Sequence, residues 1–127
     1  MKIELAPKKI GVEIPNYGTF NVMPLGAGAE AEIRIENRKI AELTKSVEPY
    51  KELVEKEENG EEVDTKSEEY IKAIEAYKAL GNAYDDLKDL TLRKIRACFS
   101  GKGVEKLFDD FSYEQIMQIY GEAVKNG

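Results

Sequence analysis

Residues 66–99 carry the most constraining pattern in this sequence. Apolar side chains recur there at intervals of mostly three or four residues, at Ile74, Tyr77, Leu80, Tyr84, Leu87, Leu90 and Ile95, up to Cys98 and Phe99. This spacing places them on one face of a helix. Thr65-x-x-Glu68 has the spacing of a capping box, so we expect Thr65 to cap the helix start. At about 1.5 Å per residue the helix is about 50 Å long, which suits the spine of a bundle or an arm that meets a partner.

A second helical segment, residues 27–58, precedes it. The apolar residues Ile40, Leu43, Val47, Tyr50 and Val54 repeat with the spacing of a coiled-coil seam. Pro49 interrupts the repeat, and we expect a kink or short break near Glu48. Residues 29–36 also alternate as a strand does, but their Ala, Glu and Arg content favours helix. The two segments predict a helical hairpin of residues 27–58 and 66–99, with an acidic, solvated loop at its tip.

Within the second arm of the hairpin, two features bear on packing. Gly81 lies in the helix interior, where glycine is unfavourable, and a kink is expected there. Tyr70, Tyr77 and Tyr84 are spaced by seven residues and form one stripe. The stripe is either the edge of a core or a partner surface, because tyrosine is enriched in interfaces.

The N-terminal part, residues 1–25, has strand character. Residues 2–5, 10–14 and 20–23 each alternate between apolar and polar, and the segment Asn16-Tyr17-Gly18 predicts a β-hairpin turn. So small a sheet is not stable alone and must pack on the helices or on the sheet of another chain. An unpaired edge is a ready site for strand addition between subunits.

Residues 104–125 predict short C-terminal helices, with a second capping box at Ser112-x-x-Gln115. Aromatic and apolar residues crowd this end. Some of them must pack on the long helix near Leu92, Ile95 and Phe99, and the others remain for a partner, where aromatics and Met are favoured. The candidate partner-binding residues are Phe108, Phe111, Tyr113, Met117 and Tyr120.

Composition narrows the function classes. The chain has 127 residues, which suits a single domain, and its net charge of −6 argues against nucleic-acid binding. It has no histidine, the commonest general base and imidazole metal ligand. One cysteine and no apolar run of about 20 residues indicate a reducing, cytoplasmic setting without a membrane span. We therefore expect no enzymatic activity, no cofactor and no metal, and a mainly α (α+β) fold: a small N-terminal β-hairpin or three-stranded sheet, then the helical hairpin and C-terminal helices.

Two glycine-containing segments resemble phosphate-binding motifs only loosely. Residues 26–31 match G-x-G-x-x-A, but the chain lacks the alternating strands and helices of a dinucleotide fold. Gly101-Lys102-Gly103 lacks the rest of a P-loop. Both glycine-containing segments are interpreted as turns.

The acidic residues 55–69 lack the D-x-D-x-D-G spacing of a calcium loop. We interpret them as a solvated loop.

Three stretches carry a family resemblance. They are residues 20–30 (FNVMPLGAGAE), residues 98–113 (CFSGKGVEKLFDDFSY) and residues 116–124 (IMQIYGEAV), with the charged hairpin between the first two. In this layout the chain resembles the tail assembly chaperones of siphophages and prophages of Gram-positive bacteria. The resemblance spans the whole chain in layout and is most specific in the last 30 residues or so, where a glycine turn, a Leu-Phe-Asp segment and an Ile-x-x-x-Tyr helix follow one another.

The resemblance implies a non-enzymatic protein that binds the tape measure protein, and possibly other tail proteins, and that self-associates. It also implies action in the cytoplasm of the bacterial host and absence from the mature virion. The alternative from residue chemistry alone is an acidic helical adaptor or regulatory protein that acts through protein–protein contacts, for example by masking a nucleic-acid-binding surface.

Overall fold

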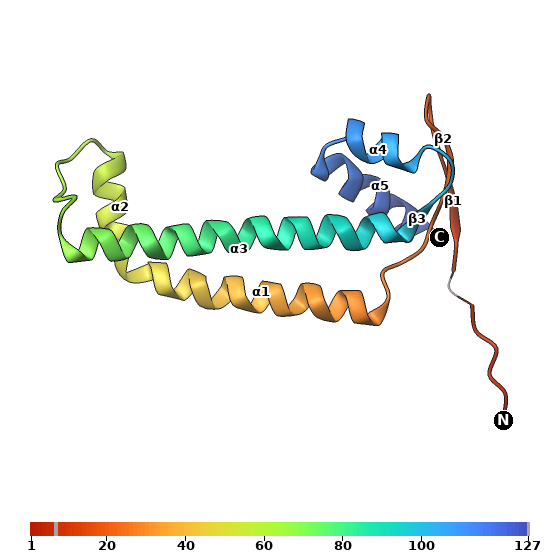
Figure 1. Ribbon diagram of the computed structural model, residues 1–127, viewed down its shortest axis with the longest axis horizontal. Coiled ribbons are helices and arrows are strands. Elements are labelled where there is room, and N and C mark those ends of the chain that lie inside the picture. Colours follow the sequence, from red (N-terminus) through yellow and green to blue (C-terminus); the bar gives the residue numbers. More distant parts are fainter. Residues whose placement is uncertain (7, 127) are drawn as a thin grey trace. The chain divides into compact units, whose positions relative to one another are not determined.

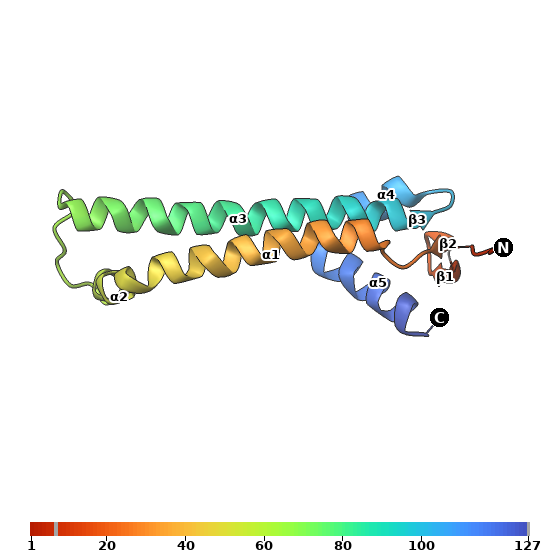
Figure 2. The same cartoon turned by 90° about the horizontal axis from the view of Figure 1, so that it is seen from below.

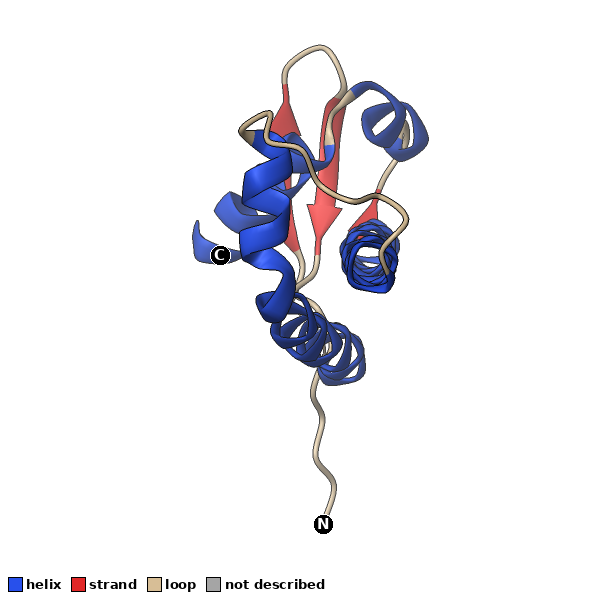
Figure 3. Ribbon diagram, turned by 90° about the vertical axis from the view of Figure 1, so that its left-hand side faces the viewer, coloured by secondary structure: helices blue, strands red, loops and turns tan. Residues whose placement is uncertain are grey.

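The computed structural model describes residues 1–6 and 8–126. Helices dominate it, and a small antiparallel sheet accompanies them, which confirms the predicted mainly α class (Figure 1; Figure 3). The elements in chain order are β1 (Ile10–Ile14), β2 (Gly18–Val22), α1 (Ala27–Val47), the 3-10 helix η1 (Glu48–Tyr50), α2 (Lys51–Glu58), α3 (Glu68–Cys98), β3 (Phe99–Ser100), α4 (Val104–Asp110) and α5 (Tyr113–Asn126).

The predicted β-hairpin is present. β1 and β2 pair antiparallel, with Ile10 opposite Val22 and Ile14 opposite Gly18. Asn16 and Gly18 both have positive φ, and the Tyr17 N–H donates to the Ile14 carbonyl over 3.0 Å. Asparagine and glycine tolerate that backbone conformation best, which is why this short segment turns the chain.

The third strand comes from a different part of the chain than the sequence suggested. Residues 2–5 are not a strand, and the sheet order is β1-β2-β3, with Val22 opposite Phe99. The Met23 N–H also donates to the Cys98 carbonyl over 2.9 Å. A strand needs a partner at hydrogen-bonding distance. β3, which directly follows α3, supplies that partner to β2 from 77 residues further along the chain.

The described chain divides into two compact units. Unit 1 combines Met1–Glu30 with Asp89–Gly127, and unit 2 is Ala31–Lys88. The prediction of one domain over residues 1–127 stays a prediction. The core of unit 1 includes the buried side chains of Phe20, Val22, Ile95, Cys98, Phe99, Val104, Leu107, Ile116 and Ala123.

Unit 2 contains most of the predicted helical hairpin. Its parts of α1 and α3 run side by side, joined through α2 and a loop (Figure 1; Figure 2). η1 separates α1 from α2 at Pro49, which confirms the predicted break. At Gly81, by contrast, α3 continues as one helix.

The start of α3 corrects the predicted cap. Glu68 is its first residue, and the Tyr70 N–H donates to the hydroxyl oxygen of Ser67 over 3.1 Å. Ser67 therefore fills the capping role that the sequence assigned to Thr65. Asp64 organises this turn: its side chain accepts from the Lys66 N–H over 3.0 Å, and its carbonyl accepts from the Ser67 hydroxyl over 2.8 Å.

The second predicted capping box is confirmed. The Gln115 N–H donates to the Ser112 hydroxyl oxygen over 3.2 Å, and the Ser112 N–H donates to the Gln115 side-chain oxygen over 2.9 Å. This reciprocal pair separates the predicted C-terminal region into α4 and α5.

Candidate functional site

The five residues predicted to bind a partner lie on α4, on α5 and in the link between them, and all five are half-buried. Four of them, Phe108, Phe111, Met117 and Tyr120, pack against the core of unit 1. This confirms that part of the C-terminal cluster packs on the end of the long helix, beside Ile95 and Phe99. A partner-binding role for the five residues stays a prediction.

Two aromatic contacts hold the cluster in place. The Phe108 ring meets the Phe99 ring edge-on, with 5.1 Å between centroids, and the Arg96 guanidinium lies 5.7 Å from the Phe108 centroid. Arg96 also forms an ion pair with Glu105. The Phe111 ring packs on Tyr17, with centroids 5.0 Å apart.

Two tyrosine hydroxyls tie the N-terminal part of unit 1 to its C-terminal helices. The Tyr17 hydroxyl donates to the Asp110 carboxylate over 2.9 Å, and this hydrogen bond raises the pKa of Tyr17. The Tyr120 hydroxyl accepts from the Leu25 N–H over 2.8 Å, while burial raises the pKa of Tyr120. Both contacts join residues more than 90 positions apart, so sequence spacing carried no signal for them.

A first apolar depression lies in unit 2, where α2 faces the start of α3. We call it the hairpin-tip groove. It has a volume of about 460 Å³ and is lined by Val54, Glu57, Glu58, Ile74 and Tyr77. Glu57 also accepts a hydrogen bond from the Tyr70 hydroxyl over 3.1 Å, which raises the pKa of Tyr70. The groove thus combines an apolar floor with carboxylates.

Unit 2 exposes four large apolar side chains among those described, and one of them, Ile74, lines the hairpin-tip groove. Ile35, Ile71, Ile74 and Tyr84 are each exposed by about half of their surface, whereas its buried apolar residues among those described are Ile40, Val47 and Ala73. The predicted tyrosine stripe is therefore divided. Tyr77 lines the hairpin-tip groove, Tyr70 bonds to Glu57, and Tyr84 faces solvent.

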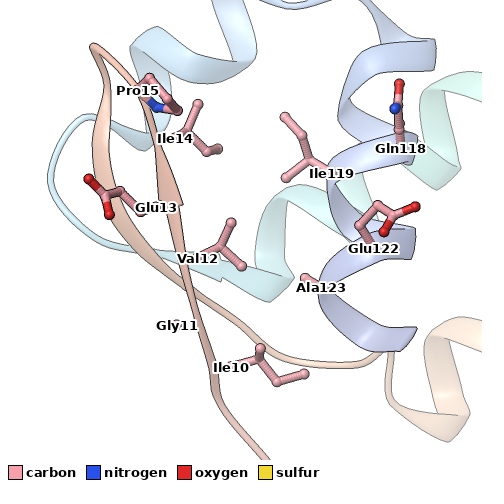
Figure 4. Close-up of a pocket in the computed structure, with 10 residues that line it drawn as sticks. All are labelled: Ile10, Gly11, Val12, Glu13, Ile14, Pro15, Gln118, Ile119, Glu122 and Ala123. Atoms are coloured by element: carbon pink, nitrogen blue, oxygen red, sulfur yellow. The ribbon is translucent and has the colours of Figure 1, made fainter. Parts of the chain in front are cut away.

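A second depression lies in unit 1, between β1 and α5, and we call it the strand groove. It has a volume of about 510 Å³ and is lined by residues 10–15 and, on α5, by Gln118, Ile119, Glu122 and Ala123. Figure 4 shows Val12 and Ile14 pointing toward Ile119, while Glu13 points away from α5. The sequence predicted an unpaired strand edge but not the helix that faces it. The alternation of Ile10, Val12 and Ile14 was the sequence signal that one face of this strand packs against another element.

The described residues contain no cluster of three or more His, Cys, Asp or Glu side chains arranged to hold a metal ion. The Cys98 thiol is buried, and burial raises its pKa, which disfavours the reactive thiolate. Among the helices of residues 1–6 and 8–126, none combines the length and the apolar character needed to cross a bilayer.

Comparison with known proteins leaves the family open. No protein-family model, curated protein or solved structure matches this chain. The resemblance to tail assembly chaperones therefore stays a prediction, carried by the three sequence stretches that suggested it.

Proposed function

We propose that this chain is a non-enzymatic tail assembly chaperone that binds a tape measure protein and keeps it soluble during phage tail assembly. It acts in the cytoplasm of the bacterial host and is not expected in the mature virion. The observation that carries the proposal is the hairpin-tip groove, an apolar depression to which the half-exposed side chain of Ile74 contributes. An exposed apolar groove is typical of a site that binds another protein.

The chemistry of the groove indicates the kind of segment that it binds. Val54, Ile74 and Tyr77 offer apolar contact, and Glu57 and Glu58 line the same depression. An amphipathic helix lays its apolar face into a groove of this type through anchors spaced three or four residues apart. Lysine or arginine beside those anchors complements the carboxylates and speeds encounter. We infer that the chain binds basic amphipathic helices of the tape measure protein.

The test is co-expression of the tape measure protein with the chain, followed by separation of soluble and insoluble protein. The variant Ile74→Gln places an amide in the groove, and we expect it to move the partner toward the pellet. Ile35→Gln is the matched control, because Ile35 is an isoleucine of nearly equal exposure, 51% against 48% for Ile74, that does not line the groove. Both side chains are exposed, so neither change should unfold the protein.

The outcomes distinguish a wrong binding site from a wrong function. A partner that stays soluble with Ile74→Gln shows that the groove is not the binding site. If the unaltered chain neither binds nor solubilises the tape measure protein, the chaperone function is wrong and the acidic adaptor becomes the better hypothesis.

A further inference from the structure

The strand groove borders an incomplete sheet. In the described chain β1 pairs with β2 alone, and β2 pairs on its other side with β3. The second edge of β1 therefore presents backbone N–H and C=O groups without a strand partner. An extended segment that adds to such an edge gains main-chain hydrogen bonds, and its alternate side chains enter the neighbouring pocket.

A segment suited to this edge is present in the same chain. Met1, Ile3 and Leu5 alternate with Lys2 and Glu4, so an extended backbone places the three apolar side chains on one face. They are among the most exposed large apolar residues described, at 114%, 69% and 89%. Figure 1 shows residues 1–6 running away from the sheet.

We propose that the strand groove of one copy binds residues 1–5 of a second copy, which add to β1 as an antiparallel strand. The register pairs Leu5 with Ile10, Ile3 with Val12 and Met1 with Ile14. Directly opposed residues of an antiparallel pair share a face of the sheet, so the three apolar side chains enter the groove beside α5.

Charge complementarity supports the same register. It places Lys2 opposite Glu13, whose side chain points away from α5, on the outer face (Figure 4). Opposite charges that face each other across two strands stabilise the pairing. In the single chain Lys2 pairs with Glu4 over 2.9 Å, but both side chains are largely exposed. An exposed ion pair contributes little to stability, so little free energy is lost when Lys2 leaves Glu4 and pairs with Glu13 of the other copy.

The occupant is a second copy because residues 1–6 form no strand along β1 of their own copy. Ala6 precedes a proline, which disfavours the helical region for Ala6 and favours an extended backbone. Two copies that exchange these segments reciprocally form a closed, two-fold symmetric dimer, in which each copy gives one strand and receives one. The exchange requires no tail protein, so it is independent of the proposed chaperone function.

Site-specific disulfide formation tests both the register and the source of the strand. Two preparations in a Cys98→Ala background, one with Ile3→Cys and one with Val12→Cys, carry tags of different mass and are mixed and oxidised. We expect a disulfide-linked heterodimer, because directly opposed residues have Cβ atoms close enough to bridge. Lys2→Cys mixed with Val12→Cys is the matched control. These two side chains lie on opposite faces in the proposed register and should not crosslink.

Two results overturn the proposal. Equal crosslinking from Lys2→Cys and Ile3→Cys, or none from Ile3→Cys, shows that the register does not form. A chain that carries both Ile3→Cys and Val12→Cys and closes on itself as an oxidised monomer shows that the segment fills the groove of its own copy.

Sedimentation of single variants measures the consequence for assembly. Ile3→Asp places a carboxylate in the apolar groove, and we expect it to shift the sedimenting species from dimer to the monomer mass of 14.3 kDa. Glu4→Gln changes a neighbouring side chain on the outer face and should leave the dimer intact. A dimer that persists with Ile3→Asp contradicts the proposal. Circular dichroism of both variants checks that the fold is retained.

Discussion

At the scale of single residues, Gly101 shows how closely the chain must approach itself to complete the sheet. Its φ is +138°, and a Cβ added there would lie 3.2 Å from the Thr19 carbonyl oxygen and 3.3 Å from Cδ1 of Phe20. Gly81 is the opposite case. It lies inside α3, and an added Cβ meets nothing within 4 Å. The surroundings therefore require a glycine at position 101 but not at position 81.

Alanine at these two positions should therefore change stability in opposite directions. Gly101→Ala is expected to lower the free energy of unfolding by about 1–3 kcal/mol, because L side chains rarely adopt that backbone conformation. Gly81→Ala should raise it by about 1 kcal/mol, the difference in helix propensity. Urea denaturation followed by circular dichroism measures both. A stabilising Gly101→Ala would show that the turn after β3 is not as close as described.

At the scale of elements, helix ends depend on which polar group reaches the free backbone N–H groups. The Ser112–Gln115 box follows from spacing alone, since both partners lie within one turn. At the start of α3, Thr65 and Ser67 compete for the same role, and Asp64 decides between them. Because Asp64 bonds to both Lys66 and Ser67, it directs the Ser67 hydroxyl oxygen toward the N–H of Tyr70.

Alanine substitution separates the two candidate caps. Ser67→Ala should destabilise the helix by about 1 kcal/mol, within the usual range of about 0.5–2 kcal/mol for loss of an N-cap. Thr65→Ala is the control and should change stability by no more than about 0.5 kcal/mol, as surface substitutions do. Thermal unfolding of the two variants gives the comparison. A larger loss from Thr65→Ala would restore the capping box predicted from the sequence.

At the scale of the whole molecule, the two units differ in how much they bury. The largest fully buried side chains, Phe20, Val22, Ile95, Leu107 and Ile116, all belong to unit 1. Unit 2 buries fewer apolar side chains and exposes isoleucines along its helices. Regions with few buried apolar contacts open at lower free energy, so we expect unit 2 to be the less protected part.

Hydrogen exchange of two matched variants tests this difference. Ile95→Ala removes a fully buried side chain and should lower the protection of β2 and α5 amides by about 2–5 kcal/mol. Ile40→Ala removes a buried isoleucine of unit 2, and its effect should fall mainly on amides of residues 31–88. Equal loss of protection in β2 from both variants would show that the chain opens as a single cooperative unit.

The sequence by itself determined the features that depend on neighbours along the chain. The helical period located α1 and α3 within a few residues, Pro49 located the break, and alternation with Asn16 and Gly18 located the β-hairpin. These signals are local because helix and turn geometry involves residues only a few positions apart. The acidic composition and the lack of histidine likewise argue, without a structure, against nucleic-acid binding and against histidine-based catalysis or metal binding.

Tertiary structure alone decided which distant segments meet. Phe99 ends the helical pattern predicted over residues 66–99, yet together with Ser100 it forms β3 because β2 offers an antiparallel partner. Phe108, Phe111, Met117 and Tyr120 were candidates for a partner, and their packing against the core followed only once α4 and α5 met the sheet. The strand groove arises in the same way, between β1 and a helix that begins almost 100 residues later. Such contacts form wherever they bury the most apolar surface in the folded chain, and sequence spacing does not encode that choice.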